Sequence, residues 1–193
     1  MNAQEPRRKE RADVARNRAK ILEAAEAHFR ASGVTASLEA VAKDAGVGHA
    51  TLFRHFPTRE ALLASLLRIH RERLLERRQE LDRLTDTAEA LRQWLLGVEE
   101  YCGLYEGLWE PLAAAARSAE ADHPLARSCE ELILTTGTYL KAAQSEGRAR
   151  PDLEGLDLFI AASAVSWLAG SGTTDEAAVA RLRTLFEIGY RTQ

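Results

Sequence analysis

The stretch that decides the fold is residues 38–56, which read LEAVAKDAGVGHATLFRHF. Its first half repeats apolar residues at steps of three and four, the one-sided pattern of a short helix; they are Leu38, Val41, Ala42 and Ala45. A second apolar set, at Leu52, Phe53 and Phe56, follows a turn that contains Gly46. Because glycine adopts positive φ at no steric cost, the stretch predicts two short helices that cross steeply over a tight turn.

The second of these helices has the dimensions to enter the DNA major groove with its N-terminal residues over the base edges. Its outward positions are Gly48, His49, Ala50, Thr51, Arg54 and His55. A plain helical hairpin has the same spacing, so the spacing leaves both readings open. Residues 1–56 hold ten Lys and Arg against seven Asp and Glu, whereas the remainder holds sixteen against twenty-two. A basic head on an acidic body favours a polyanionic partner at that end.

The flanking sequence predicts further helices. A helical pattern runs from Ala15 to Gly33, Ser37 is placed to cap the first helix of the motif, and Thr58 is placed to cap a helix from Arg59 to about Leu84. Five more helices follow, so we expect an all-α, nine-helix chain. We divide it into a flexible basic arm (1–13), a DNA-binding domain (14–60, motif 38–56), a connecting helix (61–84) and a C-terminal domain (85–193). The arm is expected either to touch DNA or to serve only as a solubilising tail.

Residues 16–66 resemble the TetR family of bacterial regulators. The resemblance lies in the pattern Phe29-x-x-x-Gly33, Ser37, Val41-Ala42-x-x-Ala45-Gly46-Val47, Thr51-Leu52-Phe53-x-His55-Phe56-x-x-Arg59-x-x-Leu62. It implies a homodimer on palindromic double-stranded operator DNA, acting by default as a repressor that a small-molecule effector releases.

The resemblance also implies roles for single residues. Ser37 and Arg59 would hold phosphates, which positions a protein without reading sequence. His49, Ala50, Thr51 and Arg54 would contact bases or nearby phosphates. His55 would either face the DNA backbone or have a capping role inside the protein. Two positions depart from the pattern. Phe53 replaces a common Tyr and cannot donate to a phosphate, and Gly48 replaces a common Ser cap, at a cost of only a few tenths of a kcal/mol.

Small and large apolar residues are mixed in the last two predicted helices, which allows helices to approach closely. The resemblance implies that these helices form an isologous dimer interface, although packing within one chain would use the same residues. The expected interface residues are Ala161, Val165, Leu168, Val179, Leu182, Leu185, Phe186 and Gly189.

Large side chains on the middle helices are candidates for an effector pocket, although for any one of them core packing is the commoner role. They are Trp94, Tyr101, Cys102, Tyr105, Trp109, Tyr139, Phe159 and Trp167. Their aromatic character favours a small apolar or aromatic effector, because such pockets are mainly apolar with a few orienting polar groups.

Other classes find little support. The five histidines show no metal-ligand spacing, and no catalytic constellation, phosphate loop or cofactor motif is visible. Cys102 and Cys129 have no disulfide-type context, so we expect a cytoplasmic protein. The most apolar stretch, Leu158 to Gly170, is shorter than the roughly 20 residues that a membrane span needs. Two other functions fit the same sequence. A helical enzyme would turn over a bound compound, and a ligand-independent architectural DNA-binding protein would have a C-terminal body without a cavity.

Overall fold

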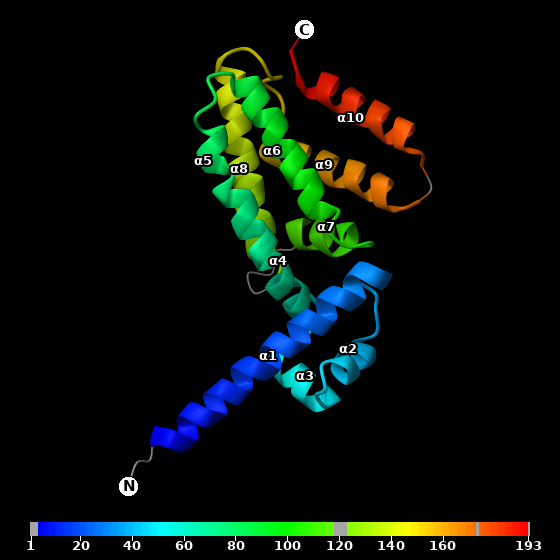
Figure 1. Ribbon diagram of the computed structural model, residues 1–193. Coiled ribbons are helices and arrows are strands. Elements are labelled where there is room, and N and C mark those ends of the chain that lie inside the picture. The colour runs from blue at the N-terminus through cyan, green and yellow to red at the C-terminus, as the bar shows by residue number, and fades with distance from the viewer. Residues whose placement is uncertain (1–3, 118–122, 173, 193) are drawn as a thin grey trace.

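The computed structural model describes residues 4–117, 123–172 and 174–192 (Figure 1). Its helices are α1 (Gln4–Ser32), α2 (Leu38–Asp44), α3 (His49–His55), α4 (Arg59–Glu76), α5 (Arg78–Leu81), α6 (Thr87–Cys102), α7 (Trp109–Arg117), α8 (Ala126–Ser145), α9 (Gly155–Gly170) and α10 (Glu176–Tyr190). The all-α class is confirmed. Within these described ranges the nine-helix arrangement is confirmed as well, except that the helix predicted over 59–84 is divided into α4 and the single turn α5.

The predicted caps start the helices where the sequence placed them. The Ser37 hydroxyl accepts a hydrogen bond from the Ala40 amide at 3.3 Å, and the Thr58 hydroxyl accepts one from the Ala61 amide at 3.1 Å. A further helix, α6, is capped in the same way by the Asp86 carboxylate, which accepts hydrogen bonds from the amides of Ala88 and Glu89. Each cap satisfies an amide that the helix itself leaves without a partner, so these ends are determined locally.

Gly33 ends α1 for two reasons. Its φ is 70°, in the left-handed region that other residues avoid. In addition, a Cβ atom at this position would lie 2.7 Å from the carbonyl oxygen of Glu106, whose carbonyl accepts a hydrogen bond from the Val34 amide at 2.9 Å. Glycine therefore permits both the turn and the close approach of the segment between α6 and α7.

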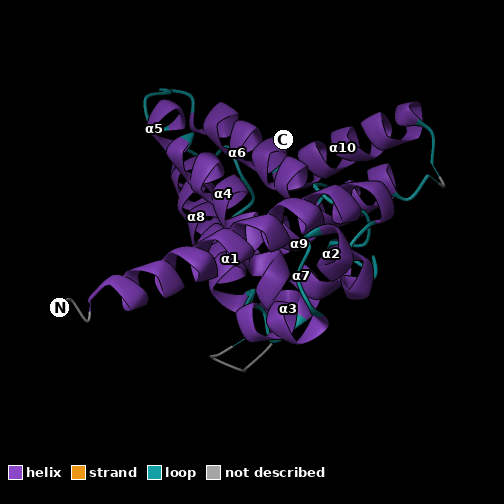
Figure 2. Cartoon of the chain, turned by 60° about the horizontal axis from the view of Figure 1, so that its bottom comes forward, coloured by secondary structure: helices purple, strands orange, loops and turns teal. Residues whose placement is uncertain are grey.

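The predicted flexible arm is the main difference from the sequence reading. The structure continues α1 back to Gln4, so residues 4–13 are helical, whereas residues 1–3 lie outside the description. The stretch is rich in Arg, Glu and Lys, which lose little conformational freedom in a helix. Without apolar periodicity it was read as irregular, but a helix that projects into solvent needs no apolar face (Figures 1 and 2).

The C-terminal body is built on α6, α8 and α9, which pack against one another, while α7 lies at the end nearest α1 and α10 packs on α9 (Figure 1). One continuous apolar core extends from Ile21 in α1 to Tyr190 in α10. The end of the chain is held by a β-bridge between Ala149 and Arg191. Within the described ranges, no helix is long and apolar enough to cross a membrane.

Candidate nucleic-acid interface and effector cavity

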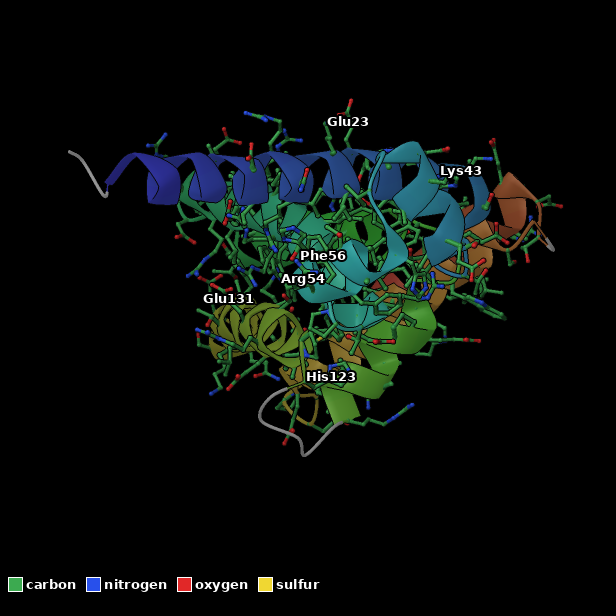
Figure 3. All side chains as sticks on the ribbon, turned by 90° about the horizontal axis from the view of Figure 1, so that it is seen from below. Glu23, Lys43, Arg54, Phe56, His123 and Glu131 are labelled. Atoms are coloured by element: carbon green, nitrogen blue, oxygen red, sulfur yellow. The ribbon has the colours of Figure 1, made fainter. Side chains whose placement is uncertain are left out.

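Helix α3 buries one side and exposes the other. Leu52 and Phe56 are buried, whereas the predicted contact residues Gly48, His49, Ala50 and Arg54 are exposed and Thr51 is half-buried. The φ of Gly46 is 65°, as the predicted turn required. Seen from below, Arg54 and Phe56 lie at the end of the molecule that α1, α2 and α3 form (Figure 3). One face of α3 is thus held by the core while the other is presented to solvent.

Aromatic contacts support this face. The ring of Phe53 is half-buried against the core and lies 4.6 Å, centroid to centroid, from the ring of His49. His55 is half-buried with its ring 6.4 Å from that of Phe56. The Arg18 guanidinium lies 4.5 Å from the centroid of the Phe56 ring. Phe53 has no hydroxyl for a phosphate, and its position favours a supporting role beneath His49.

Arg59 has a role within the protein that the sequence did not indicate, and the phosphate contact expected of it stays a prediction. Its Nη1 atom donates hydrogen bonds to the carbonyl oxygens of Val34 (2.6 Å) and Ala36 (2.7 Å). The half-buried guanidinium also lies 5.9 Å from the ring centroid of Phe29. Carbonyls in the turn after a helix lack helical partners, and Arg59 satisfies two of them. We therefore assign it to holding the turn between α1 and α2.

Ser37 remains compatible with a phosphate contact. Its hydroxyl oxygen accepts the Ala40 amide, and a hydroxyl can donate and accept at once. Because the residue is exposed, the hydroxyl proton remains accessible to a phosphate oxygen. Its role as a cap is confirmed, and its role at DNA stays a prediction.

All but one of the eight predicted pocket residues separate into two groups. Trp94, Tyr139 and Phe159 belong to the packed core of the body. The Trp94 indole donates to the Thr136 hydroxyl at 2.8 Å and stacks on Tyr139, with ring centroids 5.5 Å apart. Tyr139 in turn donates to an Asp82 carboxylate oxygen at 2.7 Å. These side chains fill the centre of the body, and the polar atoms of Trp94 and Tyr139 have hydrogen-bond partners there.

The second group lines a cavity of about 380 Å³ beside α1. Four predicted residues meet there: Cys102, Tyr105, Trp109 and Trp167. The lining also includes residues that the sequence did not nominate, among them Arg30 of α1 and Ser166 of α9. Neither carries a spacing signal that would connect α1 to the body. Tyr101 lines a different cavity, of about 280 Å³, between α4 and α6.

Burial governs the chemistry of the thiols. It raises the pKa of Cys102 to about 12 and that of Cys129 to about 12, although a hydrogen bond with the Ser163 hydroxyl partly offsets the effect at Cys102. Both cysteines are free. Burial, together with donation to Glu26, also raises the pKa of Tyr105. Among the described residues, no group of three His, Cys, Asp or Glu side chains is placed to hold a metal ion.

The predicted dimer residues are also divided. Val165 and Val179 are buried within the protomer, whereas Ala161, Leu168, Leu182 and Phe186 are half-buried and Gly189 is exposed. Leu185 is 64% exposed, and so is an unpredicted neighbour, Ile188, at 61%. Ile188 lies on the same side of α10, three residues beyond Leu185. Its spacing could have revealed it.

Comparison with known proteins gives two family matches. Residues 21–66 match the model described as bacterial regulatory proteins of the tetR family. Residues 86–192 match the model of the C-terminal domain of SbtR-like transcriptional regulators. No curated protein sequence gave a significant match.

Solved structures agree. A TetR transcriptional regulator from Streptomyces coelicolor is 35% identical, with 91% of this chain and 99% of that chain covered and a TM-score of 0.56. The ketosteroid transcriptional regulator KstR2 of Mycobacterium tuberculosis is 19% identical (91% and 95% covered, TM-score 0.60), and the fatty acid degradation regulator FadR from Bacillus halodurans is 21% identical (90% and 99% covered, TM-score 0.57). These last two share the fold. Together with the capped helix-turn-helix at residues 38–55, the matches show that the chain belongs to the TetR family and is a DNA-binding transcriptional regulator.

Proposed function

We propose that the protein is a homodimeric repressor that binds a palindromic operator through α3 of each protomer and leaves it when a small molecule binds. The observation that carries the proposal is the two-sided α3, which is locked to the core by Leu52 and Phe56 and exposes His49, Ala50 and Arg54. In a dimer, the two copies of α3 would lie about 34–36 Å apart, one turn of DNA or a near multiple. Ser37, Thr51 and His55 complete the proposed contact set.

The face formed by α9 and α10 supports the dimer. In α10 only Val179 and Tyr190 are buried, so this helix is held by one side. On the other side of α10, the large apolar side chains of Leu185 and Ile188 are exposed. Large apolar side chains gathered on an exposed face mark an interaction surface. A second copy related by a two-fold axis would cover this face with an identical one.

A mobility-shift assay on DNA from the protein's own upstream region tests operator binding. We expect a shift that survives excess random competitor DNA, and Arg54→Gln is expected to weaken it. Arg68→Gln is the matched control, because Arg68 is an exposed arginine of α4, outside the proposed interface. Equal retardation of promoter and random DNA, or equal binding by both variants, would refute the proposed use of α3.

Light scattering tests the dimer. Leu185→Arg places a charge on the exposed face and is expected to give a monomer of unchanged secondary structure. Phe186→Arg is less informative, because the Phe186 ring packs on Tyr190 at 5.3 Å and its loss would also destabilise the protomer. A dimer that withstands Leu185→Arg and Ile188→Arg would place the interface elsewhere. The domain boundaries and the cytoplasmic location stay predictions.

A further inference from the structure

We infer that the cavity between α1 and the segment joining α6 to α7 binds a planar aromatic monocarboxylate, and that its occupant acts directly on α1. The inference deepens the proposed function, because it assigns the class of effector and the place where it acts. The centre of the body is occupied by Trp94, Tyr139 and Phe159. By contrast, the cavity beside α1 measures about 380 Å³, within the range of roughly 300–1,000 Å³ typical of small-molecule pockets.

The walls of this cavity suit an aromatic ring. Trp109 and Trp167 line it together with the apolar side chains of Leu104 and Leu108. Trp109 is half-buried and Trp167 is 47% exposed, so both present indole surface that a ligand could cover. Indole faces favour offset or edge-on contact with another aromatic ring. The pair therefore selects a flat molecule.

Arg30 supplies the recognition of a carboxylate. Its Nε atom donates to a Glu26 carboxylate oxygen at 2.6 Å, and its side chain is 55% exposed. A guanidinium has five N–H donors, and in the described part of the chain its hydrogen bonds engage only Nε. The terminal donors suit the two oxygens of a carboxylate. Glu106 also lines the cavity, and its negative charge disfavours a second anionic group, which limits the ligand to one.

The cavity lies at the joint between the domains. Glu26 accepts hydrogen bonds from Arg30 and, through its other oxygen, from the Tyr105 hydroxyl. The residue after Tyr105 is Glu106, whose backbone carbonyl accepts a hydrogen bond from the Val34 amide. A ligand that draws Arg30 away from Glu26 therefore alters the contacts that hold the C-terminal end of α1. This geometry offers a direct route from the cavity to the DNA-binding domain through α1.

Fluorescence titration of the full-length protein with naphthoate tests the inference. Two of the three tryptophans, Trp109 and Trp167, line the cavity and Trp94 lies in the core, so we expect saturable partial quenching. Arg30→Gln is expected to weaken binding at least tenfold. Arg68→Gln is the matched control, because it also removes an exposed ion pair between helix neighbours four residues apart. The uncharged naphthamide should bind more weakly than naphthoate to the wild type but equally to Arg30→Gln.

A second pair of variants tests the location. Gly170 lines the cavity, and a Cβ atom there would meet no atom within 4 Å. Gly170→Leu is expected to fill the space and abolish quenching, while Gly170→Ala retains it. Quenching that persists in both Arg30→Gln and Gly170→Leu, or no saturable quenching at millimolar naphthoate, overturns the inference.

Mobility shifts separate this inference from the proposed function. Specific operator binding without naphthoate binding refutes the cavity assignment alone. Naphthoate binding with the expected variant pattern, but without specific operator binding, supports the cavity assignment and refutes the proposed repressor.

Discussion

Substitutions of Arg59 and Arg54 are expected to have opposite effects on stability and DNA binding, although both residues belong to the helix-turn-helix region. Arg59→Gln removes two hydrogen bonds from a charged donor to the Val34 and Ala36 carbonyls. Hydrogen bonds to charged groups contribute roughly 1.5–3 kcal/mol each when buried. Because Arg59 is only half-buried, we expect the pair to contribute about 2 kcal/mol. For a chain of this size, that loss lowers Tm by about 4–8 °C.

The assay pairs thermal unfolding with the salt dependence of operator binding. Arg59→Gln should lower Tm but leave the slope of log affinity against log salt unchanged, because the residue releases no phosphate counterion. Arg54→Gln should leave the free energy of unfolding within about 0.5 kcal/mol of the wild type, as exposed substitutions do, and weaken operator binding. A normal Tm with a flatter salt slope for Arg59→Gln would refute our assignment and restore the phosphate contact.

Three further predictions concern stability, the thiols and the domain joint. Hydrogen bonds from Arg92, and then Gln93, lower the pKa of Glu89 from 4.5 to about 2. Its stabilisation is therefore present above about pH 4.5 and lost as the pH falls toward 2. Since the Glu89 side chain is 35% exposed, solvent screening limits this stabilisation to about 1 kcal/mol. When the pH is lowered, the Tm of Glu89→Gln, followed by circular dichroism, should therefore fall less than the Tm of the wild type. An equal fall in both proteins would contradict this. Burial and raised pKa values should keep Cys102 and Cys129 unmodified by iodoacetamide until the chain unfolds, as mass spectrometry can check; rapid labelling of the native protein would be inconsistent. Tyr105→Phe removes the hydrogen bond to Glu26 and should cost about 1–2 kcal/mol, with faster hydrogen exchange near the end of α1; unchanged exchange there would show that this contact does not hold α1.

The sequence was most informative where structure depends on near neighbours. The caps at Ser37 and Thr58 lie within three residues of the amides they satisfy, and the positive φ of Gly46 belongs to one turn. Apolar spacing placed Leu52 and Phe56 inside, and the same spacing identified their exposed neighbours. These features follow from local geometry, which is why the fold class and the DNA-binding motif could be predicted.

The side-chain contacts that the sequence did not predict depend on meetings between distant parts of the chain. Arg59 meets carbonyls 23 and 25 residues away, and Tyr105 meets Glu26 across 79 residues. Nothing local distinguishes an arginine that satisfies buried carbonyls from one that faces a phosphate, since both have the same donors. Likewise, eight large side chains could be nominated for a pocket, but only packing could divide them between core and cavity.

By itself, the order of the residues determined most of the helices, the caps at Ser37 and Thr58 and the helix-turn-helix, because hydrogen bonds and side-chain spacing within a few residues set them. Only the tertiary structure decided that Arg59 holds a turn and that Arg30 lines a cavity with Trp109 and Trp167. It also decided which side of α10 stays exposed. Those outcomes depend on which helices meet, and that is settled by the burial of the whole apolar core rather than by any single segment.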